Sequence, residues 1–264
     1  MPKLRYPIPL GWAFAMGRDM ILGRPRSFRA DCALAVRVLP RLPVVEGLEH
    51  VPRVGPFVIV ANHYQRRDLW IGYPGGLLCH SLWSVRDDLT CHFVTTDRAI
   101  VDGATVPLTP LLFARVARVW DMVLVTPPEA LDADHEGSQR RALRRCLGLL
   151  RRTDGPSAAL IIYPEGLHGS TRGLLPASPG SGRSLLALAA TGAPLLPAAV
   201  WEELDGALHL RFGPSWRPTP PAGLPKAELD AWSSGEALRR VAKLLPDRQR
   251  GTHGAGCATE TPRR

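Results

Sequence analysis

Short apolar segments alternate with amphipathic stretches along most of the chain. Segments of strand length, rich in apolar and β-branched residues, occur at 57–62, 92–96, 122–126, 158–164, 195–200 and 208–212. Helical patterns occupy residues 11–22, 28–39, 138–152 and 183–191. Strands that alternate with helices are typical of an α/β fold with a mostly parallel central sheet flanked by helices.

Several local signals refine these elements. Phe28, Cys32 and Val36 fall on one face of the helix expected over 28–39, so this helix is amphipathic. Ser138 is a suitable N-cap for the helix over 138–152. Asp205-Gly206 predicts a hairpin turn before the last strand.

Charge divides the chain into three parts. The whole chain carries 33 Lys+Arg and 24 Asp+Glu, a net charge of +9, and residues 1–41 account for +6 of it. We therefore expect a basic amphipathic helical segment at 1–43 and a nearly neutral α/β domain at 44–246. Residues 247–264, with few apolar side chains, are expected to form a disordered tail.

This distribution excludes some classes of protein. Nucleic-acid-binding domains usually carry their charge on the folded body, and no helix-turn-helix, zinc-finger or RNP-like pattern occurs, so we expect no nucleic-acid partner. A basic amphipathic N-terminal segment suits an anionic membrane surface, although its helices can equally pack on the body, or do both. No apolar stretch predicts a transmembrane helix, and the N-terminus does not resemble a secretory signal. The five cysteines form no CxxC pair, which indicates reduced thiols.

The first candidate for chemistry follows the strand at 57–62. His63 precedes Asp68 by five residues, a spacing that allows the carboxylate to orient the imidazole as a general base. His92 and Asp97 have the same spacing, but His92 begins a strand and Asp97 lies beyond its end. The two should therefore be too far apart for contact, and we interpret His92 as structural. His63 instead sits at a strand's carboxyl end, where α/β folds place ligands.

The second candidate follows the strand at 158–164. Pro164 ends the strand and Gly166 permits a tight loop, which places Glu165 at the carboxyl edge of the sheet. A carboxylate there can hold a substrate hydroxyl, orient a loop or simply be exposed.

Together these motifs resemble those of the glycerolipid acyltransferase family, of the lysophosphatidic acid acyltransferase type. The NHxxxxD motif of that family is matched at Asn62, His63 and Asp68, and its FPEGTR motif at Pro164, Glu165 and Gly166, with Tyr163 for Phe. Its apolar Pro-x-x-Pro strand is matched at Pro194 and Pro197. The resemblance covers roughly residues 44–201.

Two arginines of the family pattern are missing. The Thr-Arg that closes the third motif is Leu167-His168 here, and the apolar strand of the second motif runs into Pro127 without an arginine. The resemblance implies that such arginines bind the acceptor's phosphate. Either other arginines replace them, or the acceptor carries no phosphate; the candidates are Arg66, Arg67, Arg172 and Arg183.

The resemblance implies transfer of a fatty acyl group from acyl-CoA or acyl carrier protein to an acceptor hydroxyl, with a lysophospholipid as the leading acceptor. His63 and Asp68 would be the catalytic pair, and Asn62 or backbone amides would stabilise the oxyanion. Glu165 and Gly166 would shape the acceptor site. No metal or cofactor is expected, and the protein would attach peripherally to the cytoplasmic face of the membrane. Acylation of a phosphate-free alcohol or lyso-aminolipid, a thioesterase and a non-catalytic lipid-binding protein remain alternatives.

Overall fold

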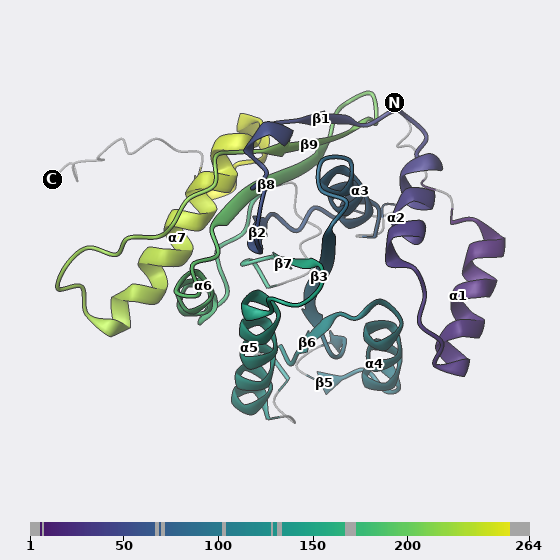
Figure 1. The fold of residues 1–264 in the computed structure, drawn as a ribbon, viewed down its shortest axis with the longest axis horizontal. Helices are drawn as coiled ribbons and strands as arrows, with labels where there is room; N and C mark the ends of the chain where they lie inside the picture. The colour runs from purple at the N-terminus through teal and green to yellow at the C-terminus, as the bar shows by residue number, and fades with distance from the viewer. Residues whose placement is uncertain are drawn as a thin grey trace, which may run out of the picture.

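A seven-stranded sheet runs through the centre of the structure, with helices on both faces (Figure 1). The structure is a computed structural model that describes residues 6, 8–66, 69, 72–101, 104–127, 129–130, 134–166 and 173–253. The fold is α/β, as the alternation of strand and helix patterns predicts.

Five neighbouring strands of the sheet are parallel. Across the sheet the order is β1 (Val44–Glu46), β9 (Leu208–Phe212), β8 (Leu195–Glu202), β2 (Phe57–Ala61), β7 (Ser157–Ile162), β3 (Leu89–Thr96) and β6 (Val123–Val125). Strands β8 to β6 run in one direction, and β9 pairs antiparallel with β8 through the predicted hairpin. The carboxyl ends of the parallel strands therefore meet at one edge. A separate hairpin, β4 (Ile100–Val101) with β5 (Ala104–Thr105), follows β3.

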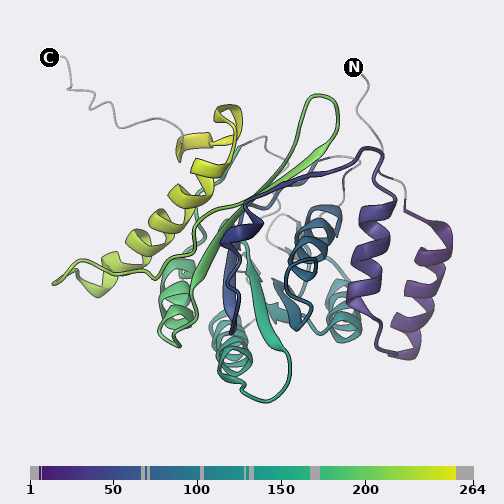
Figure 2. The same cartoon turned by 45° about the horizontal axis from the view of Figure 1, so that its top comes forward.

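Two apolar cores lie on opposite faces of the sheet. In the fully buried strand β2, Phe57, Ile59 and Ala61 belong to one core, while Val58 and Val60 belong to the other. The first core contains residues of α2 (Phe28–Arg37) and α3 (Gly72–Trp83). The second contains residues of α5 (His135–Arg151), α6 (Ser181–Ala189) and α7 (Lys226–Leu244). Figure 2 shows the two helical layers on either side of the sheet.

All six strands expected from the sequence are present, with boundaries within three residues of those expected. The helix expected to begin at Ser138 instead begins at His135, and the Asp134 carboxylate caps it by accepting from the Gly137 N–H at 2.8 Å. The Ser138 hydroxyl accepts from the Thr126 N–H at 2.9 Å, so it fastens α5 to the end of β6.

The expectation of a disordered tail from Asp247 is wrong for its first part. Residues Asp247–Gln249 and Gly251–His253 form two short 3-10 helices. Gln249 is buried, and its carbonyl oxygen accepts from the Leu174 N–H at 2.9 Å. Residues 254–264 lie outside the described residues.

Besides the apolar packing of α2 in the first core, one buried carboxylate fastens the N-terminal segment to the body. Asp31 of α2 accepts hydrogen bonds from Trp12 of α1 (Leu10–Leu22) and from Trp120 of α4 (Thr109–Trp120), both at 2.8 Å. Arg26 donates to both oxygens of the same carboxylate and to Asp19 of α1. Three helices are therefore joined at one side chain.

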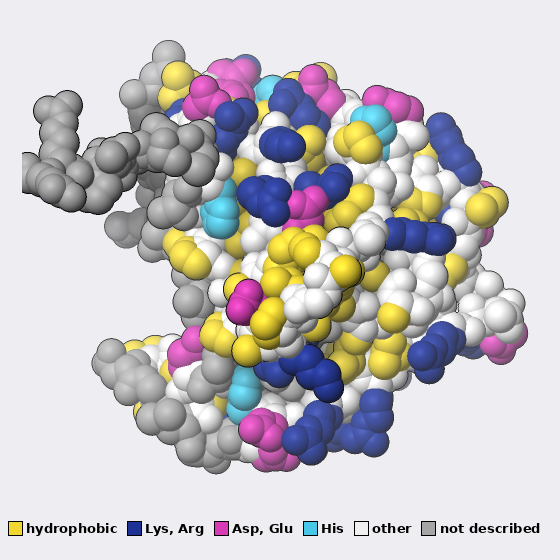
Figure 3. All heavy atoms as spheres, turned by 90° about the vertical axis from the view of Figure 1, so that its left-hand side faces the viewer, with side chains coloured by type: hydrophobic (Ala, Val, Ile, Leu, Met, Phe, Trp, Pro, Cys, Tyr) yellow, Lys and Arg dark blue, Asp and Glu magenta, His cyan; other side chains and the backbone are white. Residues whose placement is uncertain are grey.

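The outer face of α1 remains exposed and apolar, with Leu10, Phe14 and Ile21 each about three-quarters exposed. On the opposite side of the molecule, which carries α7, acidic, basic and apolar side chains are interspersed (Figure 3). Within the described residues, every helix is too short or too polar to cross a bilayer. The four described cysteines, Cys32, Cys79, Cys91 and Cys146, are buried and unbridged.

We expect the attachment of the N-terminal helices to weaken in acid. Burial alone would raise the pKa of Asp31, but the hydrogen bonds from Arg26, Trp120 and Trp12 outweigh burial and hold that pKa below its ordinary value. A lowered pKa means that the stabilisation is present at neutral pH and is lost as the pH falls from about 4 through the folded-state pKa. Tryptophan near-ultraviolet circular dichroism between pH 7 and pH 2 measures this loss.

Asp31→Asn should lower the free energy of unfolding at pH 7 by about 2 kcal/mol or more, because the Arg26 charge loses a buried partner. Its acid transition should also be shallower. Asp87→Asn, at an exposed position, is the matched control. An Asp31→Asn protein with wild-type stability and the wild-type acid transition would contradict this account of the helical contact.

Candidate active site

Polar residues follow four adjacent strands at the carboxyl edge of the sheet. Strands β2, β7, β3 and β6 pair in register, with Val60 opposite Ile162, Ile161 opposite Phe93, and Thr96 opposite Val125. Continuing this register places four residues at one level beyond the strand ends: His63, Glu165, Asp97 and Thr126. Both motifs singled out in the sequence therefore meet at the same edge.

The Glu165 carboxylate joins the two motif loops. Its Oε1 accepts from the backbone N–H of His63 at 2.6 Å, and its Oε2 accepts from the backbone N–H of Leu175 at 2.7 Å. The residue is only 3% exposed, and burial raises its pKa, although the two N–H groups work against that rise. Both oxygens are used by backbone donors, so Glu165 positions His63, whereas the sequence suggested that it shapes the acceptor site.

Gly166 makes the tight turn after Glu165. Its φ of +66° is left-handed, and a Cβ at this position would lie 2.2 Å from the Ser178 hydroxyl. Ser178 in turn donates from its hydroxyl to the Glu165 carbonyl oxygen at 3.0 Å and from its N–H to the Pro164 carbonyl oxygen at 2.8 Å. Only glycine fits this turn, so the role seen for Gly166 is to hold the Glu165 loop.

Asn62 extends the pairing of β2 with β8. Its side-chain Nδ2 donates to the Val200 carbonyl oxygen, and its Oδ1 accepts from the Val200 N–H, both at 2.8 Å. The amide is buried and acts as one more step of the strand ladder. Since both polar atoms are used in this way, Asn62 holds the loop of His63, and the sequence-based expectation that it stabilises an oxyanion does not fit its geometry.

The His63 ring packs edge-on against Tyr163, with ring centroids 4.9 Å apart. Tyr163 in turn stacks on Phe93 of β3 at 6.1 Å. Burial raises the pKa of the Tyr163 hydroxyl well above its ordinary value, so Tyr163 is a neutral packing partner of His63. Asp68, the expected partner of His63, lies outside the described residues.

The other histidine with the same spacing behaves as expected of a structural residue. The Nδ1 of buried His92 lies 2.9 Å from the Asp121 carbonyl oxygen. Asp97 interacts with different groups, namely Arg98 and Thr126.

Arg66 is held in an ion pair. Its Nε and Nη2 donate to the two oxygens of Glu202, at the carboxyl end of β8, both at 2.5 Å. The guanidinium also lies over the ring of Tyr6, 5.5 Å from its centroid, and the Tyr6 hydroxyl donates to the same carboxylate at 3.0 Å. Arg66 thus fastens the loop after β2 to the β8–β9 hairpin.

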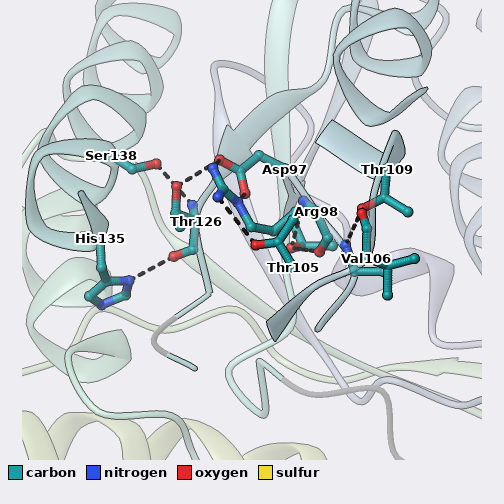
Figure 4. Close-up of polar contacts among 10 residues, drawn as sticks. Asp97, Arg98, Thr105, Val106, Thr109, Thr126, His135 and Ser138 are labelled. Carbon is teal, nitrogen blue, oxygen red and sulfur yellow. Dashed lines mark hydrogen bonds and ion pairs between the residues drawn. The ribbon is translucent and has the colours of Figure 1, made fainter. Parts of the chain in front are cut away.

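A network beyond the ends of β3 and β6 was missed by the sequence analysis (Figure 4). The Thr126 hydroxyl donates to Asp97 Oδ2 at 2.6 Å, and Arg98 Nε donates to Asp97 Oδ1 at 2.9 Å. Burial would raise the pKa of Asp97, but the hydrogen bonds from Arg98 and Thr126 outweigh it and lower that pKa. The signal available in the sequence was a run of polar residues, Thr95 to Arg98, across the end of an apolar strand.

Comparison with known proteins identifies the family of the chain. The family model described as Acyltransferase matches residues 43–201, more than half of the sequence. The chain belongs to this acyltransferase family. A search of the curated proteins found no match.

Among solved structures, the acyltransferase is similar to the crystal structure of the 1-acyl-sn-glycerophosphate (LPA) acyltransferase PlsC from Thermotoga maritima. The TM-score is 0.50 at 22% sequence identity, and the match covers 82% of this chain and 78% of that chain. At this identity the likeness shows a shared fold.

Three of the predicted site residues, Asp68, Arg67 and Arg172, lie outside the described residues of the acyltransferase. Leu167 and His168 lie outside them as well, whereas Arg183 is exposed at the start of α6. Within the described part of the chain, no group of three or more His, Cys, Asp or Glu side chains is arranged to hold a metal ion.

We expect Glu165→Gln to impair the acyltransferase by displacing His63. A glutamine offers one oxygen where the carboxylate offers two, so one of the two backbone N–H groups would face an amide NH₂. Because the lost contact fixes the His63 backbone, kcat should fall about 10-fold to 100-fold with a smaller change in KM. Steady-state kinetics measure this, with thermal unfolding as the check on the fold.

Glu203→Gln is the matched control, since Glu203 is another carboxylate at this edge and accepts hydrogen bonds from Trp201 and Arg248. Equal kinetic effects of the two substitutions would show that Glu165 has no special relation to His63.

Proposed function

We propose that this acyltransferase moves a fatty acyl group from an acyl thioester to the hydroxyl of a lysophospholipid, with lysophosphatidic acid as the leading acceptor. The observation that carries the proposal is the position of His63, at the carboxyl edge of the sheet and fastened by Glu165. The family match over 43–201 supports acyl transfer. The similar Thermotoga protein is a 1-acyl-sn-glycerophosphate (LPA) acyltransferase, which supports this acceptor class.

In the proposed reaction His63 is the general base. It takes the proton of the acceptor hydroxyl as the hydroxyl oxygen attacks the thioester carbonyl. The tetrahedral intermediate then expels the thiolate, which receives the proton from the His63 imidazolium, and an ester remains. Asp68 would orient the imidazole and stabilise its protonated form.

The neighbours of His63 support this role by restricting its movement. Its backbone N–H is bound by Glu165, and its ring packs in a T-shaped arrangement with Tyr163. Because the Asn62 amide is used by Val200, backbone N–H groups near His63 are the better candidates for stabilising the oxyanion.

One observation favours a second acceptor class. Two described arginines lie shortly after strands of the site, Arg66 after β2 and Arg98 after β3. Arg66 is bound to Glu202, and Arg98 is bound to Asp97. A phosphate would have to share or displace these partners. Arg67, Arg172 and Arg183 remain candidate phosphate ligands. Acylation of a phosphate-free alcohol or lyso-aminolipid is therefore the second candidate.

The donor is proposed to be acyl-CoA or acyl carrier protein. We also propose that residues 1–43 attach the protein to the cytoplasmic face of the membrane. Two features support this attachment, the exposed apolar face of α1 and the basic charge of the segment.

His63→Ala should reduce turnover with any acceptor by about 100-fold to 10,000-fold, the range for loss of a general base, without loss of the fold. Release of the free thiol from the thioester measures turnover, and circular dichroism checks the fold. His50→Ala, in the short turn before β2, serves as the control.

Retained activity in His63→Ala would overturn the assignment. Thioester cleavage by the wild-type protein at the same rate without any acceptor would favour a thioesterase. Lipid binding with no turnover on any acceptor would favour a non-catalytic protein.

An acceptor panel separates the two acceptor classes. With the same acyl chain, kcat/KM for lysophosphatidic acid should exceed that for monoacylglycerol about 10-fold or more, because charge-assisted hydrogen bonds to the phosphate contribute about 1.5–3 kcal/mol. The preference should shrink as salt is added, through screening. Equal rates on both acceptors, or preference for monoacylglycerol, would favour the phosphate-free class.

A further inference from the structure

Exposed apolar side chains gather on two neighbouring parts of the molecule. Of the 13 large apolar side chains exposed in the described part of the chain, nine lie within residues 8–22 or 101–112. The two parts adjoin, because Arg115 of α4 donates to the carbonyl oxygens of Met20 and Ile21 at 2.9 and 2.8 Å. Clustering of this kind marks a surface with a partner, whereas single exposed apolar residues need no explanation.

Three leucines at the start of α4, here called the leucine ridge, are Leu108, Leu111 and Leu112. They are 79%, 58% and 49% exposed. Leu108 also has a φ of +67°, a left-handed conformation that leucine rarely adopts. Backbone strain at a residue whose side chain contacts little of its own protein is a feature of functional segments.

The segment that carries the leucine ridge is held by a network of polar contacts, which Figure 4 draws around Thr109 and Arg98. The Thr109 hydroxyl donates to the Val106 carbonyl oxygen at 2.6 Å and accepts from the Ala99 N–H at 3.1 Å. In the same network, Arg98 donates to the Thr105 hydroxyl at 3.5 Å and to the Asp97 carboxylate. The Thr126 hydroxyl donates to that carboxylate as well. These contacts fix the leucine ridge to the ends of β3 and β6.

The position of the leucine ridge in the topology shows which edge of the sheet it lies at. The ridge follows the carboxyl end of β3, so it lies at the edge of the sheet that carries His63. Ile21 and Leu22, both exposed at the end of α1, adjoin the next turn of α4, where Arg115 donates to the Ile21 carbonyl oxygen. Arginines flank this surface: Arg24 and Arg118 are exposed, and the exposed Arg18 pairs with the buried Asp19, which Arg26 also binds. The exposed Asp121 at the end of α4 is bound by Arg145.

We propose that the leucine ridge inserts, together with the end of α1, into an anionic phospholipid surface. Apolar side chains flanked by arginines match the acyl boundary and the phosphate headgroups of such a surface. The protein then has two lipid-contacting elements, and the edge that carries His63 faces the bilayer. That this orientation serves catalysis rests on the proposed function, whereas the lipid contact does not depend on it.

The test is sedimentation of the full chain with vesicles of phosphatidylcholine alone or mixed with phosphatidylglycerol. The main variant is Leu108→Asn/Leu111→Gln/Leu112→Gln, in which asparagine tolerates the left-handed φ. Leu204→Gln is the matched control, because Leu204 is 87% exposed beside the turn between β8 and β9. We expect the triple variant to bind mixed vesicles about 10-fold more weakly or worse, and the control to bind within about twofold of wild type.

Thermal unfolding distinguishes lipid contact from a structural role. Leu108→Asn alone relieves backbone strain, so it should unfold at the wild-type temperature or above while binding vesicles more weakly. Wild-type binding by the triple variant, absence of wild-type binding to mixed vesicles, or a lower unfolding temperature for Leu108→Asn would each overturn the proposal.

Activity on a water-soluble short-chain thioester and acceptor, without vesicles, is measured in parallel. The triple variant should keep wild-type turnover there. If the wild-type protein itself shows no turnover, the proposed function fails, while the lipid contact is still decided by sedimentation.

Discussion

The buried carboxylate of Glu165 is the contact on which the site depends. It joins two backbone positions, His63 and Leu175, that belong to different loops, and His63 is 102 residues away from it in sequence. Removing a carboxylate from water is costly unless its oxygens accept strong hydrogen bonds. The burial is therefore tolerable only when both loops present their N–H groups, so each loop stabilises the conformation of the other. The left-handed turn at Gly166 and the bonds from Ser178 complete this arrangement.

The strands and the edge that carries the motifs could be predicted from the sequence, because buried parallel strands are continuous apolar runs and their carboxyl ends share an edge. Helix α3 could not be predicted in this way. It is buried on nearly every side, so its sequence shows no alternation of polar and apolar residues at the helical period. Two of its glycines leave room for close tertiary contacts. A Cβ at Gly75 would lie 3.0 Å from Phe93, and one at Gly76 would lie 3.2 Å from Ala35. For the same reason the roles of Glu165 and Asn62 were missed, because their partners are backbone groups of distant segments.

Arginine is abundant in this chain, yet much of it is structural at the carboxyl edge. Arg66 is bound by Glu202, Arg98 by Asp97 and Arg248 by Glu203. The Arg66 and Arg248 pairs link separate segments of the chain, whereas Arg98 pairs with its neighbour in sequence, Asp97; in each pair a carboxylate occupies the guanidinium. Net charge alone therefore says little about ligand binding here; what matters is which arginines have carboxylate partners.

The amide of Asn62 stands where a backbone group would stand if β2 continued for one more residue, since it both donates to and accepts from Val200. This makes the end of β2 sensitive to a chemical change in the side-chain NH₂ group of Asn62 alone. Deamidation of Asn62 would replace its NH₂ with a carboxylate oxygen facing the Val200 carbonyl oxygen, so an attraction would become a repulsion next to His63. The buried position of the amide protects it from water. Unfolding of the end of β2 would expose the amide to deamidation, and the site would then be lost slowly and irreversibly.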